Sequence, residues 1–173
     1  ISNLLRYRTL LRSVKCYDAV VIGCGAAGMA AEVEIHVGGR TVAIIDREEA
    51  LGGILMQCIH NGFGVHEFGA DLTGPEFAER LIDRVAEAGL DVYRGTTVMD
   101  IAGSEGARMV TAAGKQFGVL RFACRAVVLA MGCRERNRGN VAIAGTRPSG
   151  IYTAGLAQRL MNLDGYLPGR RAV

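Results

Sequence analysis

The stretch Tyr17 to Asp46, YDAVVIGCGAAGMAAEVEIHVGGRTVAIID, decides the fold of this chain. A short apolar run over residues 17–22 precedes a stretch of helix-forming composition over residues 26–37, and a second apolar run covers residues 41–45. Short runs rich in Val and Ile are typical of buried parallel strands, and each of these ends too soon to be a helix. The stretch therefore predicts a strand-helix-strand unit.

Three glycines, Gly23, Gly25 and Gly28, form the pattern G-x-G-x-x-G between the first strand and the helix. Gly23 allows the tight turn, Gly25 lets a pyrophosphate approach the backbone, and Gly28 lets the helix pack closely on the strand. Asp46 follows the second strand, where this fingerprint places an acid for the ribose hydroxyls. The pattern predicts dinucleotide binding. The alternatives are an ordinary glycine-rich β-α turn and, for Asp46, a solvated carboxylate at a strand end.

Composition excludes several other classes of function. The chain has 173 residues, 50% of them hydrophobic, which is enough for the core of one domain. A net charge of +3, 6% aromatic residues and no Trp argue against nucleic-acid binding. No apolar run approaches the roughly 20 residues of a membrane span, so we expect no span.

The cysteines indicate free thiols in a reducing compartment. The chain has five, none of them in a CxxC pair: Cys16, Cys24, Cys58, Cys124 and Cys133. An odd number with no secretory leader predicts a cytoplasmic protein. Cys24, inside the glycine turn, and Cys124, before a strand, are interpreted as packing residues.

Residues 1–16, ISNLLRYRTLLRSVKC, contain basic but no acidic side chains. Leu4, Tyr7, Leu11 and Val14 would share one face of a helix, so we expect a basic amphipathic N-terminal extension. A targeting or membrane-surface role is the alternative to a dispensable extension.

The segment 54–69 is predicted to be a long irregular loop, a kind of segment that is often functional. It holds the largest group of polar chemistry in the chain: Gln57, Cys58, His60, Asn61 and His66. Cys58 is a candidate reactive thiol, with a small packing side chain as the alternative, and His60 is a candidate general base. Three candidate ligands in a glycine-rich loop do not complete a four-ligand site, so we expect no metal.

The remaining chain completes an α/β pattern. A capping-box spacing at Thr73 opens a structural helix that Gly89 ends. Three short strands joined by tight turns then predict an antiparallel β-meander over residues 96–121, and the apolar run 125–131 returns to the parallel sheet. We therefore expect a Rossmann-like fold of three layers, with helices on one face of a central parallel sheet and the meander on the other. A further helix is expected over residues 154–163, and Arg134, Glu135 and Arg136 should form a solvated or interdomain charge cluster.

Together these features resemble the FAD half of the pyridine nucleotide-disulfide oxidoreductase superfamily, which combines GCGAAG, an acid, GG, a meander and VVLAMG. Four segments are closer still to the FAD/NAD-dependent oxidoreductases associated with glycerol-3-phosphate dehydrogenases and to the opine-oxidase and cyanide-synthase subunits. They are GGILMQCIHNGFG, LTGPEFAERL, LAMGCRER and GTRPSGIYTAG. The resemblance covers about residues 17–173.

The resemblance implies an FAD-dependent oxidoreductase that transfers hydride or electrons, with NAD(H) as the second nucleotide of the complete enzyme and a small-molecule redox substrate. The residues that it places at the cofactor are Gly23, Gly25, Ala26, Ala27, Gly28, Asp46, Arg47, Gly52, Gly53, Val98, Ala130 and Gly132. The macromolecular partners that we expect are a companion dehydrogenase subunit, and further copies of the chain in a homo-oligomer.

Two departures from the superfamily pattern limit what can be transferred. Disulfide reductases carry C-x4-C just after the GG, where this chain has Leu55, Cys58 and His60 but no pair of cysteines, so no dithiol relay is expected. The superfamily then continues into an NAD(P)H domain, whereas this chain ends at Val173. We therefore expect an N-terminal extension over residues 1–16, an FAD-binding domain over residues 17–132, and a connector over residues 133–173 of a C-terminally truncated enzyme.

Three rival hypotheses stay open. A single-nucleotide NAD(P)-dependent dehydrogenase would share the fingerprint but would need neither GG nor the meander. A non-catalytic electron-transfer or assembly subunit of a dehydrogenase would share every motif. The third rival is a fragment without a function of its own. The topology that the resemblance implies pairs the strand 126–131 with the first strand on one side and with a strand from beyond Val173 on the other. Without that second partner this edge should be bare, which predicts weak FAD binding and self-association.

Overall fold

The computed structural model describes residues 14–171 and residue 173. The chain forms two compact units. The first comprises Ile1–Gly53 and Ala78–Met131, and the second comprises Ile54–Phe77 and Gly132–Val173. The predicted basic helix lies mostly in residues 1–13, outside the described residues.

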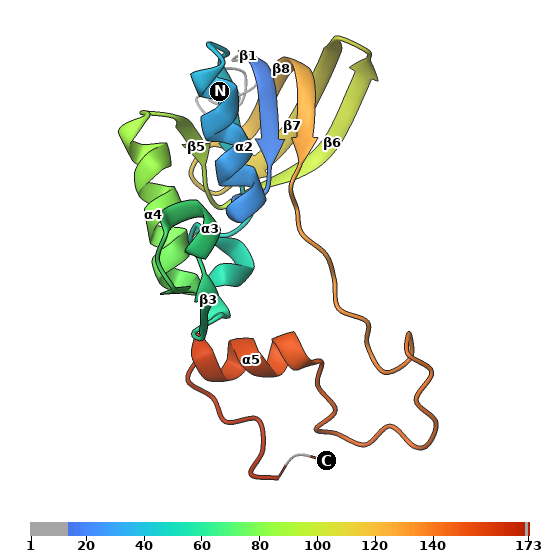
Figure 1. Ribbon diagram of the computed structural model, residues 1–173. Coiled ribbons are helices and arrows are strands. Elements are labelled where there is room, and N and C mark those ends of the chain that lie inside the picture. The colour runs from blue at the N-terminus through green and yellow to red at the C-terminus, as the bar shows by residue number, and fades with distance from the viewer. Residues whose placement is uncertain (1–13, 172) are drawn as a thin grey trace. The chain divides into compact units, whose positions relative to one another are not determined.

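The first unit is built on one six-stranded sheet with the order β5-β2-β1-β8-β7-β6 (Figure 1). The strands are β1 (Val14–Ile22), β2 (Val42–Ile45), β5 (Asp91–Tyr93), β6 (Thr96–Ser104), β7 (Ala107–Gly114) and β8 (Gly118–Leu129). β5, β2, β1 and β8 are parallel to their neighbours, whereas β8, β7 and β6 form an antiparallel meander. The predicted α/β class with a parallel sheet and a meander is confirmed.

One face of the sheet packs against α2 (Ala26–Val37). Gly28 and Met29 are buried on this side of the helix, and a methyl group added at Gly28 would lie 3.3 Å from Ile44 Cδ1. α4 (Gly74–Glu87) buries a stripe of Ala78, Leu81 and Val85 at helical spacing, as expected of a structural helix.

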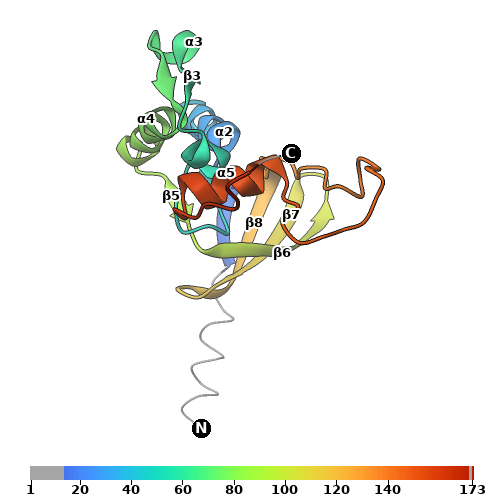
Figure 2. The same cartoon turned by 90° about the horizontal axis from the view of Figure 1, so that it is seen from below.

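The other face of the parallel strands packs against the meander, which belongs to the same sheet and forms the third layer. Tyr93 of β5 lies edge-on to Phe122 of β8, with ring centroids 4.9 Å apart. β6 starts beside the end of β2, where the Thr96 N–H donates to the Asp46 carbonyl at 2.8 Å, and then crosses toward β7 (Figure 2). The core between these layers consists of Val20, Ile22, Ala43, Ile45, Tyr93, Val110, Ala112, Leu120, Phe122 and Cys124.

Two strand boundaries differ from the sequence-based prediction. β1 begins at Val14 and not at Tyr17, because residues 14–16 pair with β8, so they belong to the sheet and not to an extension. The meander strand and the returning strand, predicted as separate elements, are one strand, β8. The residues between them, Phe122-Ala123-Cys124, include no turn former, so the chain continues straight.

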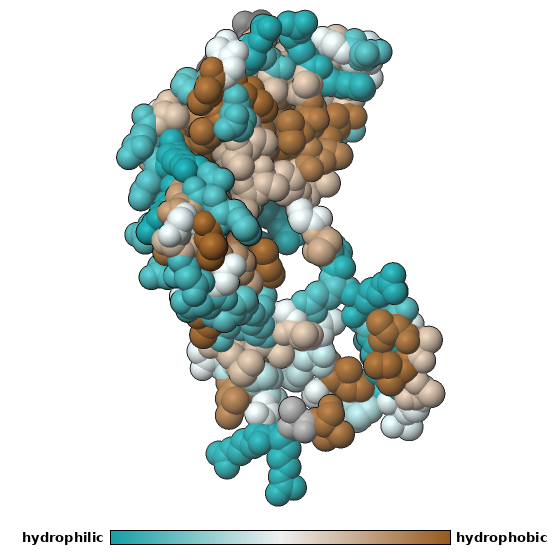
Figure 3. All heavy atoms as spheres, viewed as in Figure 1, coloured by the Kyte–Doolittle hydropathy of each residue, from teal (hydrophilic) through white to brown (hydrophobic). Residues whose placement is uncertain are grey.

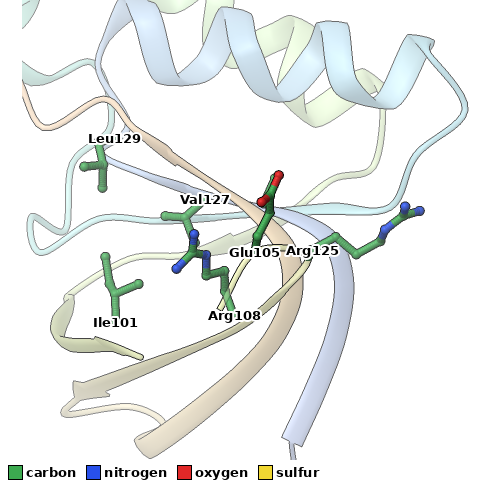
Figure 4. Close-up of a pocket in the computed structure, with 8 residues that line it drawn as sticks. Ile101, Glu105, Arg108, Arg125, Val127 and Leu129 are labelled. Atoms are coloured by element: carbon green, nitrogen blue, oxygen red, sulfur yellow. The ribbon is translucent and has the colours of Figure 1, made fainter. Parts of the chain in front are cut away.

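β8 pairs with β1 over its second half, as predicted, with Ala19 beside Ala126 and Ile22 beside Leu129. On the other side of β8 the register with β7 stops at Cys124. Within the described residues, no strand covers that edge of β8 from residue 125 onward. A shallow hollow borders this edge, and Figure 4 shows Ile101, Val127 and Leu129 around it, with Arg108 extending toward Val127.

The second unit replaces the predicted irregular loop with several short elements. They are the 3-10 helix η1 (Gly53–Gln57), β3 (Asn61–Phe63), α3 (Val65–Phe68) and β4 (Leu72–Thr73). β3 and β4 pair in an antiparallel hairpin, and Phe77 lies 5.4 Å from the ring of Phe68. The same unit includes α5 (Ala154–Asn162), which confirms the helix expected over residues 154–163. In the part of the chain that the structure describes, no helix has the length and hydropathy needed to cross a membrane.

Candidate functional site

The fingerprint residues of the first unit gather at the carboxyl ends of the parallel strands. β1, β2 and β8 end at Ile22, Ile45 and Leu129, and their ends align in the parallel register. The strand order changes direction between β1 and β8, because β2 and β5 extend the sheet on one side and β8 on the other. In open α/β sheets, ligands bind outside the strand ends at such a switch point.

The turn after β1 is as tight as the fingerprint predicts. Gly23 has φ of 105°, and a side chain there would overlap the carbonyl of Ala130. A side chain at Gly28 would overlap the carbonyl of Gly23. The Ala130 N–H donates to the Ile22 carbonyl at 2.8 Å and fixes the end of β8 beside this turn. Gly23 and Gly28 are therefore required by packing.

Gly25 has different surroundings. It is the N-cap of α2, with φ of −83°, and no atom lies within 4 Å of the position that a Cβ would take. No side chain caps α2 at this residue, and its first turn carries no acidic residue. The N–H groups and the positive end of the helix dipole thus face open space, which is the arrangement that binds phosphate groups.

Asp46 is held in place by backbone donors at the edge of this space. The Cys24 N–H donates to Asp46 Oδ2 at 2.5 Å, and the Glu48 N–H donates to Oδ1 at 2.8 Å. These bonds connect the end of β2 to the glycine turn. Each carboxylate oxygen has a further lone pair, so the side chain can also accept hydrogen bonds from ribose hydroxyls.

The glycine pair after Asp46 closes onto the same turn. The Gly52 N–H donates to the Cys24 carbonyl at 2.9 Å, and a Cβ at Gly53 would lie 3.2 Å from Gly25 Cα. Both glycines have positive φ, of 103° and 55°. A larger residue at Gly53 would therefore meet the backbone of the phosphate turn.

The other residues of the predicted cofactor set lie in different surroundings. Ala26 and Ala27 form the first turn of α2, and Arg47 is exposed, with its Nε 3.3 Å from Glu48 Oε1. Val98 packs against the core between the sheet and the meander. Gly132 is the first residue of the C-terminal segment of the second unit and has φ of 69°.

Two thiols of the first unit, Cys24 and Cys124, are buried. Burial, with the carboxylates of Asp46 and Glu32, raises the pKa of the Cys24 thiol to about 12, so it stays protonated. Burial also raises the pKa of Cys124. Both cysteines pack as predicted.

Glu32 was missed by the sequence analysis. Its side chain is fully buried on α2, and neither carboxylate oxygen has a hydrogen-bond partner among the described residues. The signal in the sequence was its position, four residues after Gly28, on the helix face that packs against the sheet.

The two candidate catalytic residues lie in the second unit. Cys58 is half-buried, and its thiol donates to the Ile54 carbonyl at 3.3 Å. His60 is exposed, with Nδ1 2.9 Å from the Asn61 carbonyl and its ring 5.3 Å from that of Phe63. No hydrogen bond joins Cys58 to His60, and no metal-binding group occurs among the described residues. Nothing in this geometry favours either as a catalytic group.

Gln57 has a defined structural role in the second unit. Its Nε2 donates to the Gly155 carbonyl at 3.1 Å and to Gln158 Oε1 at 3.0 Å. In return, Asn162 Nδ2 donates to the Gln57 carbonyl at 2.8 Å. Gln57 thus holds α5 in place. Sequence spacing could not predict this role, because the partners lie about a hundred positions away.

Known proteins resemble this chain in sequence over part of their length. No family model matches the chain. The A subunit of opine oxidase from Agrobacterium tumefaciens (strain Ach5) is 30% identical over 161 residues, which cover 88% of this chain and 30% of that protein. The chain thus spans about a third of the length of the curated relative that it matches.

Solved structures show the same fold. L-proline dehydrogenase from P. horikoshii superposes with a TM-score of 0.69 at 22% identity, over 92% of this chain and 31% of that chain. T. acidophilum thioredoxin reductase superposes with a TM-score of 0.60 at 23% identity, over 72% of this chain and 38% of that chain. The chain therefore has the same fold as the matching parts of these two enzymes, and it is similar in sequence to the A subunit of opine oxidase, as its motifs predicted.

Proposed function

We propose that this chain is the FAD-binding part of a flavin-dependent oxidoreductase. The observation that carries the proposal is the open space at Gly25, which faces the N-terminus of α2 between the Gly52–Gly53 pair and the end of β8. A dinucleotide diphosphate fits a site that combines free N–H groups, no side chain and no acidic residue in the first helical turn. The sequence similarity to an oxidase component supports the redox assignment.

The residues of the site would bind and orient the cofactor. The first turn of α2 would hold the diphosphate, and Asp46, already oriented by two N–H groups, would accept from the ribose hydroxyls. Gly53 would keep the adjoining loop close without a side chain in the path of the phosphates. When bound, FAD supplies the redox chemistry by accepting and passing on hydride or electrons.

For the complete protein we propose NAD(H) as the second nucleotide, a small-molecule redox substrate and a companion subunit. The curated relative is named as one subunit of an oxidase, which supports a multi-subunit enzyme. Cys58 and His60 receive no step in this proposal.

The test is the cofactor that the purified chain retains. We expect a yellow protein that releases FAD on denaturation, or a colourless one that binds added FAD and not NAD. Binding of NAD with no binding of FAD would favour the single-nucleotide dehydrogenase and overturn the proposal.

A second candidate is an electron-transfer or assembly subunit without turnover of its own, which the name of the relative favours. Turnover of NADH with an artificial electron acceptor separates the two functions. FAD-loaded chain that oxidises NADH is an enzyme by itself, whereas a loaded but inactive chain supports the non-catalytic role.

A further inference from the structure

Glu32 is an unusual residue to find between a helix and a sheet. Its side chain has no exposed surface, and both carboxylate oxygens lack a hydrogen-bond partner within the described chain. An ionised carboxylate in such surroundings is strongly unfavourable, so the group holds a proton instead. Burial accordingly raises the pKa of Glu32 to about 8, and the nearby carboxylate of Asp91 adds to the rise.

The position of Glu32 connects it to the phosphate turn. It follows Gly28 by four residues, on the same buried face of α2. From the rise per residue, it lies ~9 Å along the axis from Ala26 at the start of the helix. Side chains on a helix lean toward its N-terminus, which here is the phosphate turn. The Glu32 carboxylate is also among the causes of the raised pKa of Cys24, after burial and Asp46, and Cys24 lies between Gly23 and Gly25 in this turn.

The remaining charges around Glu32 do not neutralise it. Asp91 on β5 and Asp46 after β2 are acidic, and Arg94 after β5 acts on Cys24 and not on Glu32. β2, with the sequence VAII, has no titratable side chain. The other titratable or charged groups on α2 and on the strands packed against it are Glu34, His36, Lys15, Cys16, Tyr17, Asp18, Arg121, Cys124 and Arg125.

None of those groups is a partner of Glu32. Glu34 and His36 on α2 itself are exposed, as are Cys16 on β1 and Arg121 and Arg125 on β8. On β1, Tyr17 donates to Asp91 at 2.5 Å and Asp18 accepts from the Thr41 N–H at 2.9 Å. Lys15 lies over the ring of Tyr93, and burial raises the pKa of the Cys124 thiol.

We propose that Glu32 is a protonation switch for the phosphate turn: the neutral carboxyl permits tight binding of the dinucleotide diphosphate, and the ionised carboxylate weakens it. The inference rests on the proposed dinucleotide site at Gly25. One pair of unit charges about 10 Å apart in a medium of effective dielectric constant about 20 changes a binding constant by at least roughly tenfold. A diphosphate presents two negative charges at the turn. Loss of the Glu32 proton therefore opposes its binding.

The test measures the dissociation constant of FAD by fluorescence titration of the 173-residue chain and of Glu32→Gln. For the wild-type chain we expect binding to weaken by at least roughly tenfold as the pH rises from about 6.5 to about 9.5, because the carboxyl ionises in this interval. Glu32→Gln keeps the size of the side chain and cannot ionise, so its affinity should be constant over the interval. A wild-type affinity that does not change with pH, or an equal change in both proteins, would overturn the inference.

A second measurement needs no variant. By linkage, a diphosphate that disfavours ionised Glu32 must raise the pKa of Glu32, so binding near pH 8 takes up protons. Calorimetric titrations in two buffers with different ionisation enthalpies would detect this uptake, and its absence would overturn the inference even if Glu32→Gln failed to fold. FAD binding that is strong at every pH leaves the proposed function intact while removing the switch. No FAD binding at any pH would remove both.

Discussion

Gly25 and Gly28 stand three residues apart, yet an added side chain would meet opposite surroundings at the two positions. At Gly28 it would overlap the backbone of Gly23, whereas at Gly25 it would enter open space. Gly25→Val should therefore fold normally and lose FAD binding, because the side chain would occupy the volume that the phosphates need. Circular dichroism and FAD titration on the same sample measure the two effects separately.

The matched control is Gly38→Ala, at the opposite end of α2. Gly38 has φ of −70°, and an added Cβ would lie at an ordinary 3.4 Å from its neighbours. This variant should keep both fold and flavin, whereas Gly28→Val should unfold. Equal flavin retention by Gly25→Val and the wild-type chain would contradict the assignment of the phosphate site.

Glu32 should also make the stability of the chain depend on pH. Its folded-state pKa of about 8 lies above the ordinary value of 4.5, so the folded chain binds more protons between these two pH values. The free energy of unfolding should therefore be highest below pH 4.5 as far as this group is concerned. It should fall by up to about 1.4 kcal/mol per pH unit as the pH rises toward 8.

Urea denaturation of the wild-type chain and of Glu32→Gln at several pH values isolates this contribution. All other titratable groups are common to both proteins. The difference between their unfolding free energies should therefore change with pH only through the ionisation of Glu32. A constant difference from pH 5 to pH 8 would show that Glu32 is ionised in the folded chain.

At the scale of elements, Gln57 connects η1 to α5. Three hydrogen bonds join them, and the Gln57 side chain is only 7% exposed. Gln57→Leu keeps most of the volume but leaves the Gly155 carbonyl and the Gln158 amide without their donor, at a cost of about 1–3 kcal/mol. Residues 132–173 should then detach more often, and limited proteolysis between residues 137 and 150 should become faster.

Gln116→Leu provides the comparison for that experiment. Gln116 is exposed in the turn between β7 and β8, so the same substitution removes no buried hydrogen bond there. Its cleavage rate should match that of the wild-type chain. If Gln57→Leu were cleaved at the same rate as both, the hydrogen bonds of Gln57 would contribute little to holding α5.

Several elements were predictable because local signals specify them. The helix after Gly25 was predicted at its observed bounds. The capping box of α4 forms as expected, with the Thr73 N–H and hydroxyl both donating to Glu76 Oε2 at 2.7 Å. The sequence analysis predicted two strands where the structure has the one strand β8. The continuous pairing of β8 with β1 is a long-range feature, so local turn signals could not predict it.

At the scale of the whole molecule, the pairing of β8 with β1 was predicted correctly, and the division into two units was not. The glycine fingerprint shows where β1 ends, and the resemblance to the superfamily implied that the strand 126–131 pairs with β1. The division into two units depends on hydrogen bonds between Gln57 and α5. These residues are distant in sequence, so no spacing rule connects them. The same limit applies to Glu32, whose burial follows from packing and not from its own polarity.

The edge of β8 that no described strand covers is the expected site of self-association. From Ala126 to Leu129 the strand itself contains no charged residue and no Pro, and Leu129 is 61% exposed. Figure 3 shows hydrophobic side chains at the surface over the strands of the first unit. The outer strand β6 is better protected, because it contains Asp100 and an irregular register between Val98 and Asp100. Self-association should therefore proceed through β8.

We expect the 173-residue chain to form concentration-dependent oligomers, and Leu129→Lys to suppress them, because a lysine on a strand edge opposes pairing with a second chain. Val37→Lys is the control with the same charge. Val37 is 74% exposed at the end of α2 and belongs to no strand, so this variant should associate like the wild-type chain. Light scattering over a range of concentrations distinguishes the three proteins. A monomeric wild-type chain, or equal association of all three, would show that the edge of β8 does not recruit other chains.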